Sequence, residues 1–200
     1  MDKDSRPLRA DARRNRDSLV AAATAAFTTQ GVEASLEDIA AEAGVGIGTL
    51  YRHFPTRAVL IEAVYRSELE RLCDAADTLL AERAPDEALA EWMQRFVAHV
   101  AAKRGMAQAL KSAVASGDGS SELFAYAHQR IRTAAGQLLA AASAAGLVRA
   151  DVEATDLVRA MSGICLGSDL SASTEQARRL VALLMDGLRY SAPASVPVTA

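Results

Sequence analysis

The segment that most constrains the fold of this chain runs from residue 35 to residue 54, where two short helical patterns flank a glycine. Ser35 can cap the first helix, because its hydroxyl can accept a hydrogen bond from a backbone N–H of the first turn. Glu37 and Asp38 follow in that turn, where the helix dipole favours negative charge. Gly44 can adopt the positive φ that ends a helix. The segment therefore predicts two short helices joined by a tight turn.

The second short helix has one apolar face and one outward face. Leu50 and Phe54 are four residues apart, so they lie on the same side of a helix and can pack inward. A short second helix with an open outer face is typical of the helix-turn-helix, which inserts that helix into the DNA major groove. A helical hairpin buried in a core is the alternative. The candidates for the outward face are Ile47, Gly48, Thr49, Tyr51, Arg52 and His53.

The pattern continues past the second helix. Pro55 ends that helix, since proline has no N–H and disfavours helical geometry in the residue before it. Thr56 can cap the following helix, and Arg57 stands in its first turn. A cation at this place opposes the helix dipole, which is understandable if its partner is an anion such as phosphate.

Residues 44–57 (GVGIGTLYRHFPTR) together with residues 35–40 (SLEDIA) resemble the DNA-binding part of the TetR family of transcriptional regulators. Two positions depart from the family pattern, because Gly46 stands where serine is common and Arg57 where lysine is usual. The resemblance implies that Tyr51 reaches a phosphate with its hydroxyl. The full set of DNA-binding residues that it implies is Ser35, Gly46, Ile47, Gly48, Thr49, Tyr51, Arg52, His53 and Arg57.

Composition and patterning favour helices throughout. Half of the chain is apolar, only 4% is aromatic, and no run of alternating β-branched residues indicates a sheet. We therefore expect an all-α protein of about nine helices, with separate helices on either side of Gly105. The resemblance divides it into a three-helix, helix-turn-helix DNA-binding domain over residues 10–56 and a helical ligand-binding and dimerisation domain over residues 57–190. Residues 1–9 and 191–200 are expected to be disordered.

The charge of the chain is unevenly distributed. The formal net charge is −3, yet five arginines lie between Arg6 and Arg16. A local basic face can suffice for phosphate contacts, so the negative total does not exclude DNA binding, although these arginines could equally form a solvated tail. The N-terminus lacks the apolar segment of a signal peptide, and no apolar stretch is long enough to span a bilayer. We expect a cytoplasmic protein that does not contact a membrane.

The last two helical segments carry more apolar surface than one buried side requires. Excess apolar area is expected to be buried against a partner, and the family resemblance implies a homodimer held by a four-helix bundle of these segments. Two-fold pairing would suit a palindromic operator on double-stranded DNA. Packing within a single chain is the alternative. The candidate interface residues are Leu157, Met161, Ile164, Leu180, Leu184 and Leu188.

The large and polar-tipped side chains of the C-terminal part suggest a regulatory pocket. The stretch from Pro85 to Gly105 resembles the subgroup whose ligand domains are similar to that of the regulator SbtR. A cavity lined by such side chains would suit a small apolar or aromatic effector. For any one of these residues, an ordinary core position is the favoured alternative. The candidates are Trp92, Phe96, His99, Met106, Phe124, Tyr126, His128 and Met161.

Other classes of function find little support in the sequence. The three histidines do not lie near a motif serine or cysteine, and the chain contains no GxSxG, HExxH or phosphate-binding glycine loop. We expect no catalytic residue, no metal site and no cofactor. A helical adaptor that binds other proteins would explain the apolar last helices, but it leaves the outward face around Tyr51 without a purpose. The resemblance favours a repressor, and nothing in the residues excludes an activator.

Overall fold

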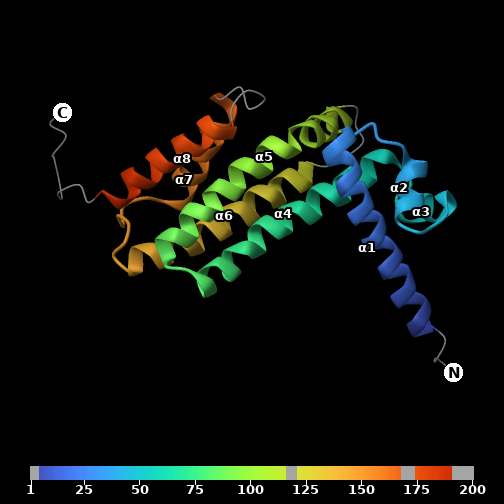
Figure 1. Ribbon diagram of the computed structural model, residues 1–200, viewed down its shortest axis with the longest axis horizontal. Helices are drawn as coiled ribbons and strands as arrows, with labels where there is room; N and C mark the ends of the chain where they lie inside the picture. Colours follow the sequence, from blue (N-terminus) through green and yellow to red (C-terminus); the bar gives the residue numbers. More distant parts are fainter. Residues whose placement is uncertain (1–4, 116–120, 168–173, 191–200) are drawn as a thin grey trace. The chain divides into compact units, whose positions relative to one another are not determined.

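The computed structural model describes residues 5–115, 121–167 and 174–190, and within these ranges the regular structure is helical (Figure 1). The predicted all-α fold is confirmed. Across the same ranges, no helix combines the length and the apolarity needed to cross a bilayer. The helices are α1 (Ser5–Gln30), α2 (Leu36–Glu42), α3 (Ile47–His53), α4 (Arg57–Glu82), α5 (Pro85–Ala115), α6 (Ser121–Ala144), α7 (Ala154–Gly167) and α8 (Thr174–Arg189).

Two helices are longer than the sequence predicted. α1 begins at Ser5, so the disorder expected for residues 1–9 is wrong for residues 5–9. Pro7 lies in the first turn, where its missing N–H interrupts no intrahelical hydrogen bond. α5 runs unbroken through Gly105, where a boundary between two helices was expected. A helix-interior glycine costs only about 1 kcal/mol relative to alanine. Residues 1–4 and the tail 191–200 lie outside the described residues.

The chain forms two compact units, Met1–Leu69 with Ala102–Ala127 and Glu70–Ala101 with His128–Ala200. Helices α4, α5 and α6 each contribute residues to both. The expected boundary between two domains at residue 56 divides the chain at a single point in the sequence, and it stays a prediction. Packing instead groups segments that are distant in sequence.

The first unit is built around the helix-turn-helix. α1 packs on α2 and α3, and α2 packs on α3. Beside this core, the Lys103 ammonium on α5 lies 3.3 Å from a carboxylate oxygen of Glu68 on α4. The buried side chains that join the helix-turn-helix to α4, α5 and α6 include Leu19, Phe27, Ile39, Leu50, Phe54, Leu60, Val64, Met106, Leu110 and Leu123.

The second unit contains Trp92, which is fully buried. Its indole Nε1 donates a 2.9 Å hydrogen bond to the carbonyl oxygen of Leu72, and its ring centroid lies 6.0 Å from that of Phe96. Cys73 follows Leu72 on α4 and is also buried, and its burial raises the pKa of the thiol to about 11. The thiol is therefore protonated at neutral pH, which agrees with a packing role.

Candidate nucleic-acid interface

The start of α2 and the turn after it are fixed by local hydrogen bonds. The hydroxyl of Ser35 accepts a 3.2 Å bond from the backbone N–H of Asp38, which confirms the predicted cap. The same hydroxyl donates to the Glu37 carboxylate over 3.3 Å. Gly44 has the expected positive φ of 71°, and the N–H of Val45 then bonds back into α2. These contacts set the geometry with which α3 leaves the turn.

α3 divides cleanly into an inner and an outer face. Leu50 and Phe54, the residue after α3, are each only 1% exposed. Ile47 and Tyr51 on the other side are 36% and 46% exposed, which is high for large apolar and aromatic side chains. Arg52 is exposed too, but it bends back along its own helix, donating to the Gly48 carbonyl oxygen and the Thr49 hydroxyl. Four of the six residues predicted to face outward are therefore exposed in the single chain, while Thr49 and His53 are half-buried.

Gly46 and Gly48 leave this face bare. A Cβ atom added to either glycine would meet no other atom within 4 Å. Gly46 caps α3 without any side-chain hydrogen bond, as its lack of a hydroxyl requires. Neither residue needs to be glycine for packing inside the chain. Their small size instead leaves room for another molecule to approach the α3 backbone.

One arginine of α1 lies beside the end of α3. The guanidinium carbon of Arg16 sits 5.4 Å from the centroid of the Phe54 ring, a cation–π arrangement beside the end of α3. Arg13 and Arg14 are exposed, and Arg14 forms an ion pair with Asp11 one turn earlier. The described part of α1 thus brings at least one cation, Arg16, to the end of α3.

Arg57 has partners inside the chain. It is the first residue of α4, and its Nη1 donates to the carbonyl oxygens of Val32 and Ala34 over 2.8 and 2.7 Å. Thr56 caps α4 by accepting a 3.3 Å bond from the N–H of Val59, as predicted. The sequence suggested an anion as the partner of the Arg57 cation. In the structure, Nη1 of this cation donates to carbonyl oxygens of the α1–α2 connection, and the contact with DNA stays a prediction.

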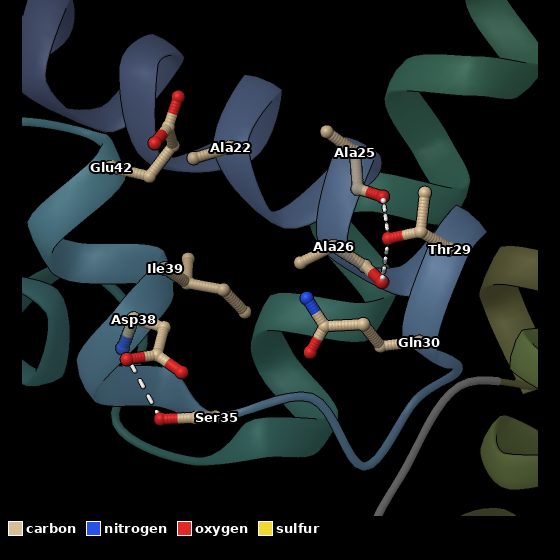
Figure 2. A pocket seen from close by; sticks show the side chains of 9 residues that line it. All are labelled: Ala22, Ala25, Ala26, Thr29, Gln30, Ser35, Asp38, Ile39 and Glu42. Carbon is tan, nitrogen blue, oxygen red and sulfur yellow. Dashed lines mark hydrogen bonds between the residues drawn. The ribbon is translucent and has the colours of Figure 1, made fainter.

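A second side of the first unit is acidic. A groove of about 270 Å³ runs between α1 and α2, with small side chains of α1 along one wall (Figure 2). Asp38 and Glu42 of α2 contribute carboxylates to it, and Ser35 lies at its end. Such a surface repels phosphate, so the open face of α3 is the better candidate for DNA. The lining residues are Ala22, Ala25, Ala26, Thr29, Gln30, Ser35, Asp38, Ile39 and Glu42.

The candidate effector residues fall into both compact units. Met106, Phe124 and Tyr126 belong to the first unit, and the other five belong to the second, so neither unit contains the whole set. Tyr126 is 37% exposed and carries the Arg66 guanidinium 4.9 Å from its ring centroid. His128 is exposed and His99 is half-buried. The members that are buried as core side chains are Trp92, Phe96, Met106 and Met161.

The candidate dimer residues also divide by burial. α7 and α8 pack on one another, and Leu157, Met161 and Leu188 are buried within this single chain. Ile164, Leu180 and Leu184 are half-buried. Leu183 on α8 is 67% exposed, although the sequence did not single it out. The sequence could not identify Leu183 as an exposed residue, because apolar residues cover more than half of the circumference of α8.

Comparison with known proteins agrees with this geometry. Residues 19–64 match the family model of bacterial regulatory proteins of the tetR family, and residues 84–190 match the model of the C-terminal domain of SbtR-like transcriptional regulators. A TetR transcriptional regulator of Streptomyces coelicolor is 49% identical, with 88% of this chain and 99% of that chain covered and a TM-score of 0.75. A TetR transcription regulatory protein of Mycobacterium vanbaalenii is 36% identical, with 92% and 100% covered and a TM-score of 0.72.

Among curated proteins, the similarity is confined to a shorter stretch. An HTH-type transcriptional regulator of Staphylococcus aureus is 33% identical over 85 residues, which are 41% of this chain and 44% of that protein. Another from the same species is 41% identical over 64 residues, or 35% of its own length. The chain therefore matches less than half the length of these curated relatives.

Proposed function

Because this chain belongs to the TetR family of bacterial transcriptional regulators, we propose that it is a repressor that binds a palindromic operator as a homodimer and is released by a small apolar or aromatic effector. The observation that carries the proposal is the division of α3. Leu50 on its inner side and Phe54 directly after it are buried at 1% exposure, while Ile47 and Tyr51 on the outer side are open. A helix held rigidly from one side and bare on the other is suited to a DNA groove.

The outer face of α3 supports contacts of two kinds. The Tyr51 hydroxyl can donate to a backbone phosphate, and the exposed Ile47 side chain can contact a thymine methyl group. The bare backbone at Gly46 and Gly48 allows the phosphates or the groove wall to come close. Arg52 would have to leave its present bonds within α3 to reach a base. Binding at this site would occur in the cytoplasm, where bacterial DNA is located.

Replacement of Gly48 by alanine is expected to have opposite effects on folding and on DNA binding. A Cβ there meets nothing in the chain, so the fold should gain about 0.5–1 kcal/mol from the higher helix propensity of alanine. On DNA the added methyl group would crowd a close-packed interface, at a cost of about 1–3 kcal/mol. Thermal unfolding measures the first effect, and fluorescence anisotropy with labelled operator measures the second.

Gly105→Ala is the matched control for this experiment. Gly105 is also a helical glycine whose added Cβ meets nothing within 4 Å, but it lies on α5. The control should gain stability without losing operator affinity. If Gly48→Ala binds operator as tightly as the wild type, DNA does not approach α3 closely at this position.

The outer side of α8 supports the homodimer. Leu183 is 67% exposed and is flanked by the half-buried Leu180 and Leu184 on the same helix. An exposed apolar strip of this kind favours burial against an identical strip related by a two-fold axis. Two α3 helices in such a dimer can read half-sites spaced by about one helical turn of DNA, roughly 34 Å.

Effector release would work through linkage between two sites. An effector that binds one conformation better than another weakens operator binding only if that conformation is the poorer DNA binder. A typical coupling of about 1–3 kcal/mol would change operator affinity about 5–150-fold. α4 is the proposed transmitter, because it starts next to the helix-turn-helix and contributes residues to both compact units. Partly accessible candidates such as His99, Phe124 and Tyr126 are better placed to meet an effector than the fully buried ones.

A further inference from the structure

Arg57 joins two segments of the first compact unit that are far apart in the sequence. Its Nη1 donates 2.8 and 2.7 Å hydrogen bonds to the carbonyl oxygens of Val32 and Ala34, which lie 25 and 23 residues earlier. These carbonyls belong to the connection between α1 and α2, and Ala34 immediately precedes the α2 cap Ser35. One guanidinium nitrogen therefore holds the start of α4 against the start of α2.

The contact explains why a cation is tolerated at the beginning of α4. A positive charge in the first turn opposes the helix dipole, and Thr56 already caps this helix with its hydroxyl. Two carbonyl oxygens offset that repulsion, because hydrogen bonds from an ionised donor are shorter and stronger than those between neutral groups. Both N–H groups of Nη1 have acceptors within the protein, so this nitrogen of the half-buried guanidinium is not free to donate to a phosphate.

The position of the contact determines what it controls. α2 begins two residues after Ala34, directly after its cap Ser35, and α3 packs on α2. A change in the Arg57 contact would shift the start of α2 relative to α4, and α3 would follow α2. The outer residues of α3 would then meet the groove at a different angle, even though none of them had been altered.

We propose that Arg57 is a positioning residue, which locks the α1–α2 connection to the first turn of α4 and thereby orients α3 for specific DNA, and that it is not a phosphate contact. This inference rests on the proposed DNA-binding function. It differs from the role that the family resemblance implies for this position, where the cation itself touches the DNA backbone. Through this contact, Arg57 would also couple a movement of α4 to the position of α3.

The salt dependence of DNA binding separates the two roles. Each phosphate contact made by a cation contributes about 0.9 to the slope of log K against log salt concentration. If Arg57 is a positioning residue, Arg57→Gln should keep the wild-type slope and the wild-type affinity for random-sequence DNA, while operator affinity falls at least about tenfold because α3 is no longer held in place. The measurement is anisotropy with labelled operator and labelled random duplex over a salt series, well below the unfolding temperature.

Two further variants make the result unambiguous. Arg66→Gln removes one arginine from the same helix without touching the α1–α2 connection, and it should leave the slope and the ratio of operator to random affinity unchanged. Arg57→Lys keeps the charge but lacks the planar fork of the guanidinium, so the ratio should fall less than in Arg57→Gln, at an unchanged slope. If Arg57→Gln does not fold, Arg57→Lys still allows the affinity ratio and the salt slope to be measured.

Each alternative has its own signature. A slope reduced by about 0.9 in Arg57→Gln, with operator and random DNA weakened alike, would identify a phosphate contact and overturn the proposal. A lower unfolding temperature with an unchanged affinity ratio would make the contact purely stabilising and would overturn it too. If the wild-type protein itself does not distinguish operator from random duplex, the proposed function fails, whatever Arg57 does.

Discussion

Leu183→Glu is expected to convert the proposed dimer to monomers and to weaken operator binding by about two to four orders of magnitude, the usual gain from linking two binding sites. Leu183 is 67% exposed in the single chain, so the substitution should leave the monomer fold intact. In a two-fold interface each chain would bring a glutamate opposite apolar surface, and both carboxylates would lose their hydration without a partner. Sedimentation velocity measures the assembly, and anisotropy measures operator affinity.

Leu147→Glu is the control for this substitution. Leu147 is another exposed leucine of the second compact unit, at 40% exposure, and it lies between α6 and α7. It should remain dimeric and should bind operator normally. A Leu183→Glu protein that still sediments as a dimer would locate the interface away from the outer side of α8.

Trp92→Ala is expected to destabilise the fold by about 3–5 kcal/mol, the usual loss when a buried aromatic side chain is truncated. Trp92 is fully buried, packs against Phe96 and donates its indole N–H to the Leu72 carbonyl oxygen. The substitution would leave a cavity and an acceptor without its donor. Circular dichroism during thermal or urea unfolding measures the loss, because the variant lacks the only tryptophan of the chain.

Trp92→Phe keeps an aromatic ring and removes the indole hydrogen bond, so it should lose less stability than Trp92→Ala. Together the two variants test whether Trp92 belongs to the core or to an effector site. A Trp92→Ala protein with wild-type stability would show that the surroundings of Trp92 do not depend on its side chain for packing. An effector contact would then become the better explanation.

Local features were the ones that could be predicted from the sequence. The caps at Ser35 and Thr56 and the positive φ of Gly44 depend on neighbours within a few residues, and all three are confirmed. The break expected at Gly105 is wrong, because the local propensity of one glycine costs little within a helix of 31 residues whose buried side chains extend from Ala88 to Leu110. Tertiary packing overrides a weak local preference.

The partners of Arg57 could not be predicted, since they are backbone carbonyls 23 and 25 residues away and have no sequence signature. The burial of the apolar residues of α8 was unpredictable for a different reason. When apolar side chains cover more than half of a helix, periodicity cannot distinguish the face toward the protein from the face toward a partner. Only the structure separates the buried Leu188 from the exposed Leu183.

The most direct test of the central claim is selection of random-sequence DNA duplexes by the purified full-length protein, followed by anisotropy on the enriched sequences at about 0.15 M salt. We predict enrichment of an inverted repeat that the wild-type protein binds at least about 10³-fold more tightly than random duplex. Tyr51→Phe, which lacks the outward hydroxyl of α3, should bind the same repeat more weakly while unfolding at the same temperature. Failure to enrich any sequence over the starting pool would contradict the claim that this chain reads DNA through α3.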